Sequence, residues 1–291
     1  MRALPASVLA ICGLIVSACG NTAYGGAGAG QTAHAHAETR TPSSARDATR
    51  AQPSEPAPGT PAPTPFPARP SKPLDGKVVV IDPGHNGGNY RDPGAISRQV
   101  NVLTQWKDCD TTGTATNGGY SEAAFTWDVS RRLAKILRAR GATVKLTRQD
   151  NDSVGPCVTE RAAIGNRADA DAAISVHADG AASTAHGFHV IMPKKIGGPV
   201  DKVVAASRRL GLAVREAFAA GTGLSYSTYL GRAALDFRDD LGGLNLSTVP
   251  KIFVECGNMR NATEAAKFTN AKFRQKIAVA LANGLHHYLE A

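Results

Sequence analysis

The segment KVVVIDPGH, residues 77–85, is a short run of β-branched residues that ends at a Pro-Gly turn. Such a run predicts a buried strand followed by a turn. Further along the chain, apolar residues at helical spacing alternate with more short apolar runs. This alternation predicts an α/β domain with a largely parallel sheet that helices cover on both faces.

The pattern assigns each element of this domain to a stretch of sequence. Ser121 is expected to cap the first long helix, which Gly141 ends, and Thr159 is expected to cap the second. The predicted strands are 77–82, 142–146, 171–176, 187–192 and 251–255, the predicted helices are 121–141, 159–170, 200–220, 262–268 and 271–289, and 83–120 is predicted to be a long loop.

The composition of the 291 residues is uneven along the chain. Ten of the 17 prolines fall between Pro42 and Pro73, whereas residues 74–291 are rich in Val, Ile, Leu and Phe. We therefore expect a disordered tether at 20–73 and one globular domain at 74–291. A collagen-like chain and a multi-spanning membrane protein are excluded, and five cysteines are too few for a small disulfide-built scaffold.

Residues 1–19, MRALPASVLAICGLIVSAC, have the features of an export signal: one positive charge, an apolar run and small residues at its end. The run is too short for an ordinary transmembrane helix. Its end, VSAC, resembles the lipobox of bacterial lipoproteins, which predicts a lipid on Cys19; cleavage near Ala18 without lipidation is the alternative. We expect export to the periplasm or cell wall, with a tether to the outer face of the cytoplasmic membrane if Cys19 is lipidated.

Ionisable residues follow three of the predicted strands. His85 lies three residues past the first, His177 directly follows AAISV, and Glu255 ends KIFV. Because parallel strands end at one edge of a sheet, these side chains are expected to gather there. Glu122 lies on the buried face of its helix, where an unpaired carboxylate would be costly.

Two histidines and a glutamate form a His2Glu zinc set that leaves a fourth position for water, as in catalytic zinc sites. The alternatives stay open at this point: Glu122 complements the helix dipole, and either His85 or His177 taken alone is a structural or surface residue.

Six segments in order resemble the zinc-dependent N-acetylmuramoyl-L-alanine amidases called amidase type 3. The segments are VVVIDPGHNGG at 78–88, DPGA at 92–95, SEAAF at 121–125, LTRQD at 146–150, ERAAIGNRADADAAISVHAD at 160–179 and VPKIFVECGNMRN at 249–261. The similarity is greatest to compact mycobacterial members that lack a wall-binding domain. It implies a single α/β domain with a mostly parallel six-stranded sheet.

The resemblance also implies an activity and a role for each site residue. These enzymes cleave the amide between the lactyl group of N-acetylmuramic acid and the L-alanine of the peptidoglycan stem peptide. By motif, His85, Glu122 and His177 are the Zn²⁺ ligands and Glu255 is the catalytic glutamate. The alternatives are a zinc peptidase acting on other peptide bonds and a non-catalytic peptidoglycan-binding or regulatory module.

Several other residues carry expectations of their own. Arg161 is expected to be structural and to pair with a carboxylate. His189, on the strand GFHVIM, faces either the cleft or away from it, because strand alternation allows both. In an exported protein Cys109 and Cys157 are a candidate disulfide, and Cys256 is expected to be a buried free thiol.

The net charge of +9 divides into +3 for the first 73 residues and +6 for the domain. A basic surface favours anionic wall polymers or acidic lipid headgroups as partners. Nucleic acid is not expected as a partner, because the chain is exported and has no nucleic-acid-binding motif. We expect a monomer that acts on peptidoglycan or muropeptide fragments.

Overall fold

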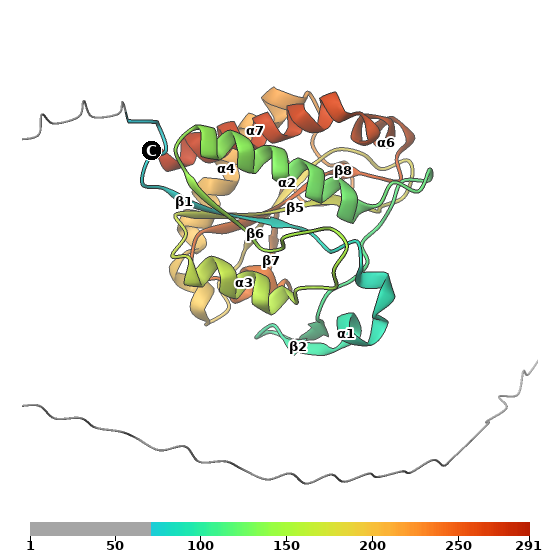
Figure 1. Ribbon diagram of the computed structural model, residues 1–291, viewed down its shortest axis with the longest axis horizontal. Helices are drawn as coiled ribbons and strands as arrows, with labels where there is room; N and C mark the ends of the chain where they lie inside the picture. Colours follow the sequence, from blue (N-terminus) through green and yellow to red (C-terminus); the bar gives the residue numbers. More distant parts are fainter. Residues whose placement is uncertain (1–70) are drawn as a thin grey trace, which may run out of the picture. The chain divides into compact units, whose positions relative to one another are not determined.

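The computed structural model describes residues 71–291, which form one α/β domain (Figure 1). The predicted export signal with Cys19, and all but the last three residues of the predicted tether, lie outside the described residues. Leu74 is fully buried, and its N–H donates to the carbonyl of Arg140 at 2.9 Å. In residues 71–291 no helix has the length and apolar character needed to cross a bilayer.

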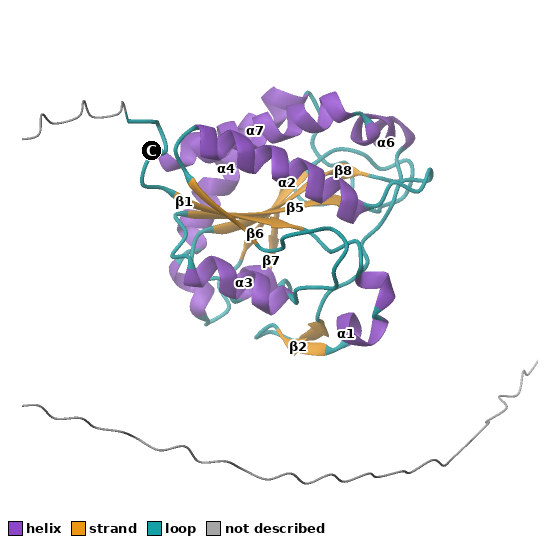
Figure 2. Ribbon diagram, viewed as in Figure 1, coloured by secondary structure: helices purple, strands orange, loops and turns teal. Residues whose placement is uncertain are grey.

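A six-stranded sheet with the order β4-β1-β5-β8-β6-β7 forms the centre of the domain (Figure 2). The first four of these strands are parallel, β6 and β7 are parallel to each other, and β6 is antiparallel to β8. The predicted, mostly parallel sheet is therefore confirmed. Its strands are β1 (Val78–Pro83), β4 (Thr143–Leu146), β5 (Ala172–Asp179), β6 (His189–Pro193), β7 (Leu235–Arg238) and β8 (Lys251–Asn258).

The sequence pattern did not predict β7, because its four residues lie at the edge of the sheet and none of them is fully buried. An edge strand exposed in this way has no continuous apolar run. The resemblance to a six-stranded family was the only signal for it.

Helices cover both faces of the sheet, as predicted. One face packs on α2 and α4, and α7 packs on both of these helices (Figure 1). The other face packs on α3 and α5. The helices are α1 (Pro93–Ser97), α2 (Glu122–Ala139), α3 (Val158–Arg167), α4 (Val204–Thr222), α5 (Gly242–Asn245), α6 (Ala262–Thr269) and α7 (Ala271–Leu289), with short 3₁₀ helices at Asn89–Arg91 and Pro199–Lys202.

The ends of α2 follow from its sequence. Ser121 accepts a hydrogen bond from the Ala124 N–H at 3.3 Å, and Gly141 has the positive φ of 105° that suits the residue after a helix. The helix predicted at 159–170 is present as α3, but its predicted cap was wrong, because Thr159 lies inside the helix and Cys157 is the N-cap residue. Cys157 makes no side-chain cap bond, and its sulfur is joined instead to Cys109.

The predicted loop at 83–120 also contains local structure. The Asp92 side chain accepts from the Ala95 N–H at 2.8 Å and begins α1, with Pro93 in the first turn. A two-stranded antiparallel hairpin follows, formed by β2 (Gln99–Asn101) and β3 (Trp106–Asp108). These elements have three to five residues each, too short for a periodic apolar pattern.

Candidate metal centre

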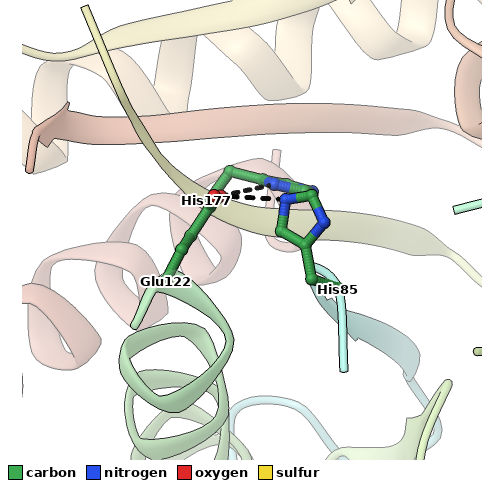
Figure 3. Close-up of side chains that lie close together, drawn as sticks. All are labelled: His85, Glu122 and His177. Atoms are coloured by element: carbon green, nitrogen blue, oxygen red, sulfur yellow. Dashed lines mark hydrogen bonds and ion pairs between the residues drawn. The ribbon is translucent and has the colours of Figure 1, made fainter. Parts of the chain in front are cut away.

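Three side chains predicted as metal ligands meet at the carboxyl edge of the sheet. His85 follows β1, Glu122 is the first residue of α2, and His177 lies on β5. The Nε2 atom of His85 lies 3.2 Å from Glu122 Oε2, and the Nδ1 atom of His177 lies 2.9 Å from Glu122 Oε1. Figure 3 shows the two imidazoles and the carboxylate turned toward one another.

This donor set suits a metal ion. One ligand atom from each of His85, Glu122 and His177 lies within 4.8 Å of the other two, and two nitrogens with one oxygen are donors that Zn²⁺ accepts. The backbone leaves room for the three side chains. A Cβ atom on Gly113 would lie 2.7 Å from both Glu122 Oε2 and the His85 ring, and one on Gly84 would collide with the His177 ring.

The Glu122 carboxylate is held from several sides. Its Oε2 accepts from the Thr114 N–H at 3.0 Å, and its Oε1 accepts from the Ala178 N–H at 3.2 Å. Burial alone would raise the pKa of Glu122, but His85 and His177 outweigh burial and hold this pKa well below its usual range. Glu122 therefore stays ionised, which is the form that binds metal.

His85 has polar partners on the side away from Glu122. Its Nδ1 lies 3.1 Å from the Thr111 carbonyl oxygen and 3.4 Å from Asp110 Oδ1. A metal-binding histidine usually has such partners on its other ring nitrogen, and here they leave Nε2 available to a metal ion. Burial lowers the pKa of His85, but Glu122 and Asp110 outweigh burial and raise it to about 10. A metal ion must therefore displace a proton from this ring.

The buried guanidinium of Arg161 connects His85 to the sheet. It pairs with Asp82 Oδ1 and with Asp110 Oδ2, each at 2.9 Å, and donates to the His85 carbonyl oxygen at 2.9 Å. The prediction that Arg161 pairs with a carboxylate is confirmed. Lys251 lies 3.3 Å from the other oxygen of Asp82, so the Asp82 carboxylate pairs with two cations, Arg161 and Lys251.

Glu255 lies beside the three candidate ligands. It is the register partner of His177 on the neighbouring strand β8, and all four side chains line one cavity of about 290 Å³. Burial, together with the Asp179 and Glu122 carboxylates, raises the pKa of Glu255 well above its usual range. A raised pKa makes a carboxyl group better able to hold a proton and to return it during a reaction.

The remaining sequence predictions have mixed outcomes. Cys109 and Cys157 form a disulfide with a Cα–Cα distance of 4.5 Å, and Cys256 is a buried free thiol, as predicted. His189 is fully buried on the same sheet face as its register partner Glu255, but it is not among the residues that line the cavity.

A family model described as N-acetylmuramoyl-L-alanine amidase matches residues 79–287. The chain belongs to this amidase family. It is 39% identical over 218 residues to an N-acetylmuramoyl-L-alanine amidase of Mycobacterium tuberculosis, and the match covers 74% of this chain and 88% of the relative.

Two solved mycobacterial amidases have the same fold. Ami1 of Mycobacterium smegmatis matches with a TM-score of 0.70 at 38% identity, over 74% of this chain and 98% of that one. Ami1 of Mycobacterium abscessus matches with a TM-score of 0.70 at 40% identity, over 74% of this chain and 100% of that one. The resemblance to compact mycobacterial members is therefore confirmed, and the chain is an amide-hydrolysing enzyme.

The sequence of this amidase did not indicate the roles of Asp110, Asp82 and Lys251. Asp82 and Lys251 lie in the segments VVVIDPGHNGG and VPKIFVECGNMRN, but neither these segments nor the sequence around Asp110 indicated a role for the three charges. They become recognisable only when the fold brings them within 3.5 Å of His85 or of one another. The single available signal for Asp110 was its position next to Cys109, which was expected to form a disulfide.

Proposed function

We propose that the chain is a zinc-dependent amidase that hydrolyses the bond between the lactyl group of N-acetylmuramic acid and the L-alanine of the stem peptide. The observation that carries this proposal is one cavity lined by His85, Glu122, His177 and Glu255. A His2Glu donor set with an adjacent acid–base group is the arrangement of zinc hydrolases. The family match supports peptidoglycan as the substrate.

The chain's own residues divide the work. His85, Glu122 and His177 hold the metal, which when bound polarises the scissile carbonyl and makes water in the cleft more acidic. Glu255 accepts the proton that the attacking water loses, and it delivers that proton to the nitrogen of L-alanine as the amide C–N bond breaks. The raised pKa of Glu255 supports this exchange between base and acid.

The enzyme is proposed to work outside the cytoplasm as a monomer. The export features of residues 1–19 support this location, with Cys19 as the lipidated residue that tethers the enzyme to the membrane. Among the relatives, one from Staphylococcus epidermidis is named a probable cell wall amidase, at 27% identity over 76% of this chain and 61% of that relative.

Mass spectrometry of digested muropeptides tests the reaction. The zinc-loaded enzyme should release stem peptides that begin at L-alanine and leave N-acetylmuramic acid intact, and a chelator should stop the release. Glu255→Gln should keep its zinc and lose about 10²–10⁴-fold in kcat, because only the proton transfer is removed. His177→Ala should lose tight zinc binding, whereas the control His287→Ala, at an exposed histidine of α7, should keep both zinc and activity.

Other results would overturn the proposal in distinct ways. Cleavage within the stem peptide would make the chain a peptidase. Muropeptide binding without turnover by the zinc-loaded protein would make it a binding or regulatory module. Stoichiometric tight zinc in His177→Ala would remove that residue from the ligand set.

A further inference from the structure

Arg238 carries a positive charge in the cavity of the candidate metal centre that the proposed reaction does not use. It ends β7, its side chain is 34% exposed, and within residues 71–291 it is the one lysine or arginine that lines this cavity. The register between β7, β6 and β8 places it on the sheet face that carries Phe253 and Glu255, which line the same cavity. The charge is therefore accessible to a bound substrate.

The guanidinium of Arg238 is bound along only one of its edges. Its Nε donates to Asp240 Oδ1 at 2.7 Å, and its Nη2 donates to Asp240 Oδ2 at 2.6 Å. A guanidinium has five N–H donors in a rigid plane, and within residues 71–291 those on Nη1 have no hydrogen-bond partner. The edge formed by Nη1 and Nη2 thus stays open to a second acceptor that has two oxygens.

Asp240 is itself held in place, so it fixes the orientation of this guanidinium. Lys107 of β3 lies 3.0 Å from Asp240 Oδ2. The carbonyl oxygen of the preceding residue, Asp239, accepts from the buried Asn245 amide at 2.7 Å. Two cations and one carboxylate leave one positive charge in the group Arg238, Lys107 and Asp240. The pair with Asp240 therefore orients the guanidinium without cancelling the attraction for an anion.

The negative charge of the proposed substrate lies on one side of the scissile bond. The lactyl carboxyl of N-acetylmuramic acid is consumed in the amide, and the hydroxyl and acetamide groups of the sugar are neutral. Carboxylates therefore belong to the stem peptide, beyond the L-alanine nitrogen. An arginine in the cavity meets a matching charge on the peptide side and none on the sugar side.

We propose that Arg238 binds a carboxylate of the stem peptide through its open Nη1–Nη2 edge, so that the peptide extends from the metal centre toward the end of β7. This inference rests on the proposed amidase reaction, and it adds which side of the cavity takes the peptide. The planar fork of a guanidinium matches both oxygens of a carboxylate, which gives direction as well as attraction. A contact of this kind, remote from the scissile bond, is present before and during the reaction and so affects KM more than kcat.

The test combines variants of Arg238 with matched substrates. The substrates are N-acetylmuramoyl-L-alanyl-D-glutamate with both carboxyl groups free, and the same compound with both groups converted to amides. Arg238→Gln removes the charge, and Arg238→Lys keeps the charge but not the planar fork. The control is Lys194→Gln, which removes a cation outside the cavity, where the pair with Asp239 is 49% and 51% exposed. Peptide release by the zinc-loaded proteins gives kcat and KM.

We expect the wild-type enzyme to prefer the free-carboxyl substrate. Arg238→Gln should raise KM for that substrate by about 10–100-fold with kcat nearly unchanged, because a charge-assisted bidentate contact is lost. The same variant should change KM for the diamide by less than about threefold, because the diamide has no carboxylate to bind. Arg238→Lys should be intermediate on the free-carboxyl substrate, and Lys194→Gln should match wild type on both.

Two results would overturn the inference. An equal rise in KM for both substrates in Arg238→Gln would mean that Arg238 only shapes the cavity through Asp240. A wild-type enzyme that does not distinguish the two substrates would mean that no carboxylate is bound. If Arg238→Gln does not fold, Arg238→Lys takes its place, with a smaller loss confined to the free-carboxyl substrate. Failure of the proposed function looks different, because there the wild-type enzyme releases no peptide that begins at L-alanine from either compound.

Discussion

Removing the guanidinium of Arg161 should lower the free energy of unfolding of the domain far more than removing an exposed arginine from the same helix. The Arg161 side chain is 4% exposed and bonds to two carboxylates. The substitution Arg161→Met keeps an unbranched apolar stem and removes all of these contacts. The lost hydrogen bonds run to Asp82 and Asp110 at 2.9 Å, to the carbonyl oxygens of Pro83 and Pro156 at 2.8 Å, and to the His85 carbonyl oxygen at 2.9 Å.

The size of the effect follows from what each partner has left. Asp82 keeps Lys251, Thr147 and Ser175 as partners. Asp110, 5% exposed, loses the Arg side chain that pairs with its Oδ2 and keeps the Thr111 N–H at 2.8 Å and the His85 ring, whose Nδ1 lies 3.4 Å away, both on Oδ1. Removing one partner of a buried ion pair costs about 3–5 kcal/mol. The three carbonyl oxygens that lose their hydrogen-bond donor add to this loss. We expect a loss of at least about 4 kcal/mol, a large part of the roughly 5–15 kcal/mol that stabilises a domain.

Denaturant unfolding of the metal-free proteins measures this loss, which corresponds to a fall in Tm of about 8–16 °C for a domain of this size. Arg161→Lys should lose about half as much, because an ammonium group keeps the charge but cannot serve all five acceptors. The control is Arg167→Met on the same helix, where the pair with Glu160 is 62% and 48% exposed and should contribute under about 1 kcal/mol. A loss at Arg161 no larger than at Arg167 would refute the reasoning.

Two more predictions concern the disulfide and the metal. Replacing Cys109 and Cys157 by Ser should lower the free energy of unfolding by roughly 4 kcal/mol, since the bridge closes a loop of 48 positions; a loss under about 1 kcal/mol in denaturant unfolding would contradict this. Because the pKa of His85 is raised to about 10 in the metal-free protein, zinc binding at pH 8 should release about one proton, and its affinity should fall as the pH falls. Calorimetry in buffers of different ionisation enthalpy measures that release, and zero protons would rule out His85 as a ligand.

The prediction of the fold from sequence succeeded where a pattern was long and continuous. β1, β5 and β8 are buried runs of six to eight residues, and α2 has both a capping serine and a terminal glycine. It failed where an element is short or lies at an edge. β7 and α5 have four residues each, and neither has an apolar repeat long enough to be distinguished from a loop.

The same division applies to the site. His85, Glu122 and His177 were predicted as metal ligands from local motifs, because a metal-binding side chain needs a particular residue type at a strand end or a helix start. Asp110 and the buried pairs of Arg161 could not be identified in this way. Their partners lie 51 and 79 positions apart in the chain, and no local rule relates such residues.

The sequence by itself thus determined the residue types of the candidate metal centre, the strand and helix alternation, and the family. The tertiary structure alone decided which charges are paired in the interior and that His189 lies beside Glu255. The physical reason is that the register between β5, β8 and β6 sets which side chains share a sheet face. A shift of one residue in that register would turn His189 to the opposite face and leave Glu255 without its neighbour.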